Sequence, residues 1–321
     1  MNLAQSIETH VPMIDLCHPK SSDEEIAAIV RDAAIKHGFF AVTGHSVPKE
    51  VISRHVAVQK QFFSLPLEKK MQISVNKSNC GYTVIGEETL DVEGSTVDTR
   101  EGLYYRRSSP GNPLDGQNQW PGEEDVPGYR SAVERYMDEL TKLGYRLLEL
   151  VSLSLGFDKS YLNAFFKEPM ITLRPLKYQP VDSDERAGIY GAGKHTDYGC
   201  LTILYAPQPG LQIFQKGEWV AIDPLQDGFV INIGDMLEYW TCGLYKSTIH
   251  RVMTGHEKER YSFPFFFEPQ FDAQIQPLPG YLPEGGAQKY PPITSGEYLL
   301  QKYAKTHAEF SKTMENSQNV M

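Results

Sequence analysis

Hydrophobic positions in the first half of the chain recur at helical spacing. Ser22 and Glu25 have the spacing of a capping box, ahead of an apolar periodic run that Gly38 ends. A second helical pattern starts at Pro48, a residue type favoured at the first helical position. The longest pattern runs over residues 127–156 and keeps apolar side chains three or four positions apart. These stretches predict three amphipathic helices that pack on a larger element.

The second half shows short runs of β-branched and aromatic residues instead. Gly, Pro, Asp and Lys separate these runs, and no repeat of fixed period is visible. Several short strands at this spacing predict a sandwich or a barrel. The strands predicted there are Met170–Tyr178, Cys200–Tyr205, Leu211–Phe214, Trp219–Ile222, Phe229–Ile233, Thr248–Met253 and Tyr261–Phe267. One short strand, Phe39–Val42, is predicted in the first half.

Residues 76–121 differ from both halves, because they are rich in Gly, Pro, Ser, Asn and Asp and have weak periodicity. An irregular stretch of this length is usually functional or disordered, and its aromatic and basic run Leu103–Arg107 favours a function. No linker-like segment divides the chain. We therefore expect a single unit over 1–321, with a mostly helical part over 1–165, a β-core over 166–290 and a C-terminal helix and tail over 291–321.

Composition and charge exclude several classes of protein. A net charge of −10 argues against nucleic acid as a partner, because nucleic-acid-binding domains present a basic face. No run of about 20 apolar residues could span a membrane, and the N-terminus lacks the basic and apolar segments of a secretory signal. The four cysteines form no metal-binding or redox pair, which is typical of free thiols in a reducing compartment. We expect a cytoplasmic protein, and a monomer by default.

The sharpest local feature is the segment Gly193–Gly199, with sequence GKHTDYG. In an extended backbone, residues two apart point to the same side, so His195 and Asp197 can offer an imidazole nitrogen and a carboxylate oxygen to one metal. The flanking glycines let the backbone turn and leave room beside the metal. A lone His-x-Asp also recurs by chance in structural roles, so a third ligand has to come from elsewhere.

The best third ligand is His250, which lies in a predicted strand. Two histidines and one carboxylate form the facial triad of non-haem iron oxygenases. Iron(II) takes six ligands, so three positions remain for a chelating oxo-acid and O₂. A histidine on an apolar strand is also often a satisfied core residue, and the same three ligands could hold zinc in a hydrolase. A hydrolase would need a general base beside the metal, and the sequence offers no obvious one.

A candidate co-substrate site lies ten residues after His250, where an Arg-x-Ser pair, uninformative by itself, gains weight from its position one hairpin beyond that histidine. On a strand, Arg260 and Ser262 face the same side. Arginine presents a fork of N–H donors matched to a carboxylate, and the serine hydroxyl adds a third donor. This set suits the distal carboxylate of 2-oxoglutarate, with the keto-acid end on the iron. Tyr178, near the end of an earlier strand, could supply another hydroxyl.

The motifs taken together resemble the isopenicillin N synthase-like group of iron- and 2-oxoglutarate-dependent oxygenases, over nearly the whole chain. The opening resembles the group at Val11–Leu16, His37–Phe40, His45–Pro48, Phe62–Pro66 and Asn118–Pro121. The core matches it in order at His195–Asp197, Asn232–Asp235, Tyr245–Ser247, His250–Val252, Arg260–Ser262 and Pro264–Pro269.

The resemblance implies a distorted double-stranded β-helix, or jelly roll, flanked by helices, with the metal inside its mouth. It implies that His195, Asp197 and His250 bind Fe(II), and that Arg260, Ser262 and Tyr178 bind 2-oxoglutarate. The implied reaction uses O₂ to oxidise an unactivated C–H bond of a small metabolite and releases succinate and CO₂. Hydroxylation, desaturation and ring closure all stay open, as do a 2-oxoglutarate-independent iron oxidase of the same fold and a non-catalytic jelly-roll binding protein.

Three residues are candidate substrate contacts. Tyr104 and Arg106 lie in the irregular stretch, and Phe267 ends a core strand. Arg106 with Arg107 could meet a substrate carboxylate, such as that of an amino-acid derivative. A solvated surface pair is the more ordinary interpretation, because most charged side chains are exposed.

Overall fold

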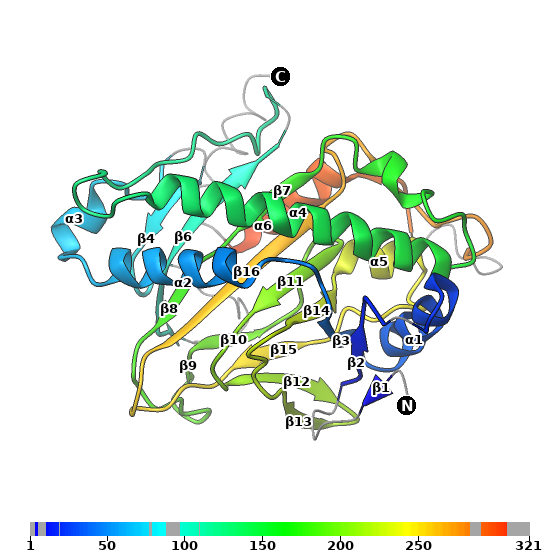
Figure 1. Ribbon diagram of the computed structural model, residues 1–321, viewed down its shortest axis with the longest axis horizontal. Coiled ribbons are helices and arrows are strands. Elements are labelled where there is room, and N and C mark those ends of the chain that lie inside the picture. Colours follow the sequence, from blue (N-terminus) through cyan, green and yellow to red (C-terminus); the bar gives the residue numbers. More distant parts are fainter. Residues whose placement is uncertain are drawn as a thin grey trace.

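A computed structural model of the chain describes residues 4–5, 11–18, 20–76, 79–87, 97–108, 110–282 and 290–306. Within these residues, ten strands form one large sheet and four form a smaller one. The large sheet crosses the centre of the molecule, with the small sheet beside it (Figure 1). The tail expected at the end of the C-terminal part, after His307, lies outside the described residues.

The large sheet is almost entirely antiparallel. Its order is β1-β2-β3-β14-β11-β16-β7-β6-β4, and β8 bridges β16 and β6. β2 and β3 form its one parallel pair within the described chain. Its strands are β1 (Ala4–Gln5), β2 (Met13–Asp15), β3 (Phe39–Thr43), β4 (Gly81–Thr83), β6 (Arg100–Arg107), β7 (Met170–Leu173), β8 (Leu176–Tyr178), β11 (Leu201–Tyr205), β14 (Phe229–Ile233) and β16 (Arg260–Glu268).

The small sheet has the order β10-β15-β12-β13. These strands are β10 (Ala192–His195), β12 (Leu211–Gln215), β13 (Glu218–Ala221) and β15 (His250–Val252). An apolar cluster that includes Phe39, Ile213 and Val230 fills the space between the two sheets. Two facing antiparallel sheets around one apolar layer make a jelly roll, so the fold class expected from the sequence is confirmed.

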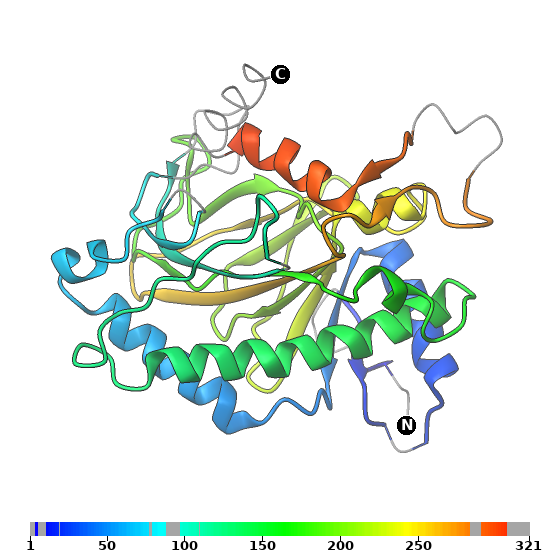
Figure 2. The same cartoon turned by 90° about the horizontal axis from the view of Figure 1, so that it is seen from above.

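Helices flank the large sheet. They are α1 (Asp23–Lys36), α2 (Lys49–Phe63), α3 (Leu67–Met71), α4 (Tyr129–Ser154), α5 (Asp235–Trp240), α6 (Ser295–Thr306) and the short 3₁₀ helix η1 (Leu162–Phe165). α2 and α4 lie on one side of the sheet, and α6 lies on the other (Figure 2). Two short pairs complete the structure: β5 (Val97–Asp98) with β9 (Ile189–Tyr190), and β17 (Gln274–Ile275) with β18 (Ile293–Thr294).

The contact between α4 and the sheet is tight. Gly144 in α4 faces the ring of Phe267, and a Cβ added at this glycine would lie 2.8 Å from the ring. Tyr145 meets the same ring edge-on at 5.3 Å between centroids. The close approach lets the helix bury its apolar stripe directly on β16, which accounts for a glycine at this position in a helix.

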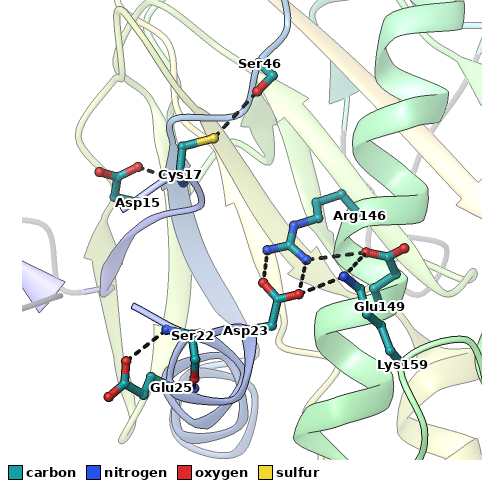
Figure 3. Close-up of polar contacts among 9 residues, drawn as sticks. All are labelled: Asp15, Cys17, Ser22, Asp23, Glu25, Ser46, Arg146, Glu149 and Lys159. Carbon is teal, nitrogen blue, oxygen red and sulfur yellow. Dashed lines mark hydrogen bonds and ion pairs between the residues drawn. The ribbon is translucent and has the colours of Figure 1, made fainter. Parts of the chain in front are cut away.

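α1 begins with the capping box that the sequence predicts. Ser22 Oγ accepts the Glu25 N–H at 3.2 Å, and the Glu25 carboxylate accepts the Ser22 N–H at 3.0 Å (Figure 3). Next to the cap, Asp23 is ion-paired to Arg146 of α4 and to Lys159 (Figure 3). Hydrogen bonds from Arg146 and Lys159 hold the pKa of Asp23 well below its usual range. This cluster fixes the start of α1 against the long helix.

The stretch over 76–121 is less irregular than expected, because it contains β4, β5 and β6. β6 is eight residues long, and all but its last residue are buried. Its arginines Arg100 and Arg106 are buried in the protein, whereas the sequence pattern treats such residues as solvated. None of the helices in the described part of the chain is long and apolar enough to cross a bilayer.

Candidate active site

His195 and His250 lie opposite each other on adjacent strands. They are register partners in the antiparallel pair of β10 and β15, and their ring centroids are 4.2 Å apart. His195 Nδ1 lies 2.8 Å from the Gly193 carbonyl, and His250 Nδ1 lies 3.0 Å from the Thr248 carbonyl. Because a carbonyl only accepts, each Nδ1 carries the proton and donates it. In the neutral form of each ring, the lone pair then lies on Nε2.

Asp197 follows β10 and completes the group. Its Oδ2 accepts hydrogen bonds from Thr202 Oγ1 at 2.5 Å and from Asn232 Nδ2 at 2.7 Å. Its Oδ1 lies 3.7 Å from His195 Nε2 and 3.6 Å from His250 Nε2. One ligand atom from each residue lies within 4.8 Å of the other two. Thr202 and Asn232 thus orient the carboxylate so that its second oxygen faces both imidazoles.

The protonation of His195 and Asp197 suits a metal. Burial and the neighbouring His250 lower the pKa of His195 to about 3, so this imidazole is neutral. Burial alone would raise the pKa of Asp197, but the two histidines and the bonds from Thr202 and Asn232 outweigh it and lower the pKa. Two imidazoles and one carboxylate on one side of a point match the donor set of non-haem iron(II) sites. The residues present therefore fit the iron that the sequence implies.

Arg260, Ser262 and Tyr178 come together at one end of the same hollow. β16 and β8 pair so that Arg260 lies opposite Tyr178, and the guanidinium lies 4.7 Å from the Tyr178 ring centroid. The Tyr178 hydroxyl lies 3.1 Å from Ser262 Oγ. Burial lowers the pKa of Arg260 below its ordinary value.

The guanidinium of Arg260 is incompletely satisfied. Its Nε donates to the Pro209 carbonyl at 2.9 Å, whereas its buried Nη1 has no hydrogen-bond partner among the described residues. A buried charged donor without an acceptor is costly and is rare in folded proteins. A ligand carboxylate would supply this acceptor, so the donor set fits 2-oxoglutarate.

The metal-ligand group and the Arg260 group open into one hollow of about 1010 Å³, including its open mouth. Tyr104, a predicted substrate contact, lines the hollow. Arg106 is not among the lining residues, and its guanidinium lies over the rings of Tyr104 and Tyr303 at 5.7 and 5.2 Å. Arg107 is on the surface and pairs with Asp138, which agrees with the ordinary interpretation for this residue.

Phe267, a predicted substrate contact, is not among the residues that line the hollow. Its ring is fully buried against α4, on the outer face of the large sheet. Its neighbours Phe266 and Glu268 line the hollow instead. Side chains alternate along a strand, so an error of one position exchanges the two faces.

Several lining residues were missed by sequence reasoning: Arg100, Arg174, Tyr198, Glu268 and Tyr303. The period of two along Arg260–Glu268 could have identified Glu268, because it carries the parity of Arg260 and Ser262. Burial raises the pKa of Glu268 to about 8, against the opposing effect of the Cys200 backbone N–H. The sequence pattern does not indicate the strand β6. The alternation of side chains that places Arg100 and Tyr104 on the same face could therefore not be inferred.

Comparison with known families and proteins agrees with this geometry. Residues 11–123 match the model described as "non-haem dioxygenase in morphine synthesis N-terminal". Residues 166–269 match the model of the 2OG-Fe(II) oxygenase superfamily, and they include all three residues of the metal-ligand group.

Individual relatives match over most of their length. A 2-oxoglutarate-Fe(II) type oxidoreductase of Emericella nidulans is 34% identical over 87% of this chain and 84% of that protein. Homoarginine-6-hydroxylase of Oryza sativa subsp. japonica is 32% identical over 88% of this chain and 90% of that protein. The crystal structure of a full-length Neurospora crassa protein in complex with α-ketoglutarate and thymine has a TM-score of 0.81 and 26% identity, covering 94% of this chain and 99% of that one.

The chain therefore belongs to the 2-oxoglutarate- and Fe(II)-dependent oxygenase family. It is an oxidoreductase that uses Fe(II), 2-oxoglutarate and O₂ to oxidise a small-molecule metabolite.

Proposed function

We propose that His195, Asp197 and His250 hold the iron, and that Arg260, Ser262 and Tyr178 hold the distal carboxylate of 2-oxoglutarate. One observation carries the first assignment: the protein satisfies one polar atom of each ligand residue and leaves the other facing a common point. This division leaves one lone pair of each residue for a metal. A purely structural cluster would have no need to turn three acceptor atoms toward one another.

With iron bound, the site supplies oxidative chemistry, in which 2-oxoglutarate and O₂ are consumed, succinate and CO₂ leave, and a substrate C–H bond is oxidised. The residues of the chain position the reactants. Thr202 and Asn232 fix the Asp197 carboxylate, and the Gly193 and Thr248 carbonyls fix the two imidazoles.

The unpartnered Nη1 of Arg260 supports the 2-oxoglutarate assignment. Ser262 and Tyr178 lie beside the guanidinium and can donate hydroxyl hydrogen bonds to the same carboxylate. Such a bond set selects a dicarboxylate of one length, because its two ends must reach the iron and the arginine together.

For the substrate, we propose a small carboxylate or amino-acid derivative that contacts Tyr104. Two further guanidiniums, of Arg100 and Arg174, line the hollow in addition to Arg260, which favours an anionic group on the substrate. Arg106 acts indirectly, by supporting the rings of Tyr104 and Tyr303. Among the relatives, one is named for homoarginine and one was solved with thymine, which supports a small nitrogenous metabolite as the substrate of this chain.

We also propose a single catalytic unit that works as a monomer in a reducing compartment such as the cytoplasm. The N-terminal part supports the first point, because its strands β3 and β6 are internal strands of the large sheet. All four cysteines carry free thiols, which supports the compartment.

The function is tested by aerobic incubation of iron-loaded protein with 2-oxoglutarate, followed by measurement of succinate. We expect succinate that depends on iron and disappears with a chelator, faster when the substrate is present. Zinc-loaded protein serves as the control and should form none. Iron-loaded protein that binds 2-oxoglutarate but forms no succinate with any small metabolite would favour a non-catalytic binding protein.

A further inference from the structure

The inner face of β16 carries opposite charges at its two ends. Residues 260, 262, 264, 266 and 268 share one parity and all line the hollow. Arg260 begins this row and Glu268 ends it, eight positions later, which corresponds to roughly 26 Å of extended strand. The pocket is therefore polarised along one strand, with a guanidinium at the co-substrate end and a carboxyl group at the other.

The metal-ligand group lies between these two ends. Thr202 and Asn232, which hold Asp197, are register partners, and Thr202 is also paired with Phe266 of β16. Along β16, Arg260 lies on one side of Phe266 and Glu268 on the other. If 2-oxoglutarate extends from the metal toward Arg260, then the part of the hollow near Glu268 is left for the substrate.

The fold makes specific room for the Glu268 carboxyl group. A Cβ added at Gly199 would overlap both carboxyl oxygens, so any larger residue at position 199 would displace them. Oε2 accepts the Cys200 N–H at 2.7 Å, which fixes the orientation of the group. The residue is 4% exposed and lines the hollow.

The second oxygen of Glu268 lacks a partner. Within the described chain, Oε1 accepts no hydrogen bond, and no lysine or arginine forms an ion pair with Glu268. A buried acidic group that is neither paired nor fully hydrogen-bonded is costly. Aromatic side chains of Tyr198, Phe266 and Tyr303 line the same hollow, and aromatic rings favour organic cations.

We propose that Glu268 recognises the substrate, by accepting hydrogen bonds from a basic nitrogen group such as an ammonium or a guanidinium. This inference rests on the proposed function, because it places the substrate on the side of the metal away from 2-oxoglutarate. It narrows the proposed amino-acid derivative to one whose cationic nitrogen points along β16 toward Gly199 and Glu268.

The test compares the binding of three probes of similar size and shape to the iron-loaded, 2-oxoglutarate-bound protein without O₂. The probes are n-butylguanidinium, n-butylammonium and the neutral n-butylurea, and calorimetric titration measures each Kd. The guanidinium should bind the wild-type protein about 10- to 100-fold more tightly than the urea, as expected for hydrogen bonds to a charged group. Equal binding of the cations and the urea, or no binding of either cation, would overturn the proposal.

Three variants assign the preference to one carboxylate. Glu268→Gln should bring the Kd of n-butylguanidinium close to that of n-butylurea and leave the Kd of 2-oxoglutarate unchanged. Glu259→Gln makes the same substitution at a side chain that is 45% exposed, and should keep the full preference. Glu268→Asp retains a carboxyl group one methylene further back and should keep a reduced preference, which covers the case in which the glutamine variant does not fold.

Two outcomes distinguish a failure of this inference from a failure of the proposed function. A Glu268→Gln protein that binds 2-oxoglutarate and keeps the wild-type preference for the cation contradicts the role of Glu268 alone. A wild-type protein that binds iron but no 2-oxoglutarate contradicts the proposed function, and the substrate placement with it.

Discussion

The two faces of β16 have opposite characters, although they belong to the same nine residues. Its outer face presents Phe263, Phe265 and Phe267, which are fully buried and belong to the main apolar core. Its inner face presents Arg260, Ser262 and Glu268 among its lining residues. One face holds α2 and α4 on the sheet, and the other forms the reaction pocket. Alternate residues of β16 therefore serve different purposes: one set stabilises the fold, and the other forms the reaction pocket.

Because of this separation, the fold should tolerate substitutions on the inner face of β16 and should lose stability when the outer face is changed. Polar groups on the inner face are satisfied by ligands or by a few specific bonds, so their loss mainly changes binding. Apolar groups on the outer face are close-packed, and the loss of one leaves a cavity. Substitutions on the two faces should thus separate into activity changes and stability changes.

The largest effect on activity should come from His195→Ala. It removes one of the three ligand atoms and only one protein hydrogen bond, to the Gly193 carbonyl. We expect succinate formation to fall to the background rate, with a melting temperature close to that of the metal-free wild type. His256→Ala is the matched control, because His256 lies on the surface beside Asp182. Wild-type turnover in His195→Ala would contradict the ligand assignment.

The outer face should respond to Phe267→Ala with a large loss of stability. The fully buried ring packs against Gly144 and Tyr145, so its removal leaves a cavity and should cost about 3–5 kcal/mol of unfolding free energy. Denaturant titration measures this cost. The Kd of 2-oxoglutarate at a temperature where the variant is folded should be unchanged. A variant as stable as wild type would contradict the division of β16 into two faces.

Arg260→Met should weaken 2-oxoglutarate binding while the iron stays bound. Removing the charged hydrogen bonds to the distal carboxylate should raise the Kd about 10- to 100-fold, and the stability of the ligand-free protein should not fall. Stability should hold because the variant also removes a buried donor that has no partner in the ligand-free protein. Unchanged affinity for 2-oxoglutarate would place its carboxylate elsewhere.

The smallest effect should come from Asp23→Asn, far from the pocket. Asp23 is partly exposed, so the loss of its ion pairs should cost about 1 kcal/mol. The depressed pKa of Asp23 means that its contribution is present above the unfolded pKa of about 3.9 and is lost as the pH falls below it. The stability difference between wild type and variant should therefore shrink between neutral pH and about pH 3. A difference that does not vary with pH would contradict this ion-pair account.

The helices could be predicted from the sequence because their signals are local. The capping box at Ser22 and the apolar period over 127–156 lead directly to α1 and α4. The sequence pattern predicts one strand over Met170–Tyr178, whereas the structure has two strands, β7 and β8, separated at Arg174 and Pro175. Proline lacks the N–H that a continuous ladder needs, so the interruption follows from its chemistry.

The metal ligands were predictable and the pocket walls were not. His195, Asp197 and His250 stand in short motifs whose spacing reflects coordination by one centre. The walls are built by tertiary pairing of distant strands, such as the pairing of Arg106 with Thr172. Buried arginines on β6 look like surface residues in a one-dimensional pattern, and only the closed sheet shows which way they face.

The most direct test of the account is an anaerobic titration of iron-loaded protein with 2-oxoglutarate, followed by visible absorption. We expect a weak charge-transfer band that saturates at one equivalent, is absent in His195→Ala and needs more 2-oxoglutarate in Arg260→Met. Bound iron without any band would contradict chelation of 2-oxoglutarate at this centre. No iron binding by the wild-type protein would contradict the assignment of the three ligands.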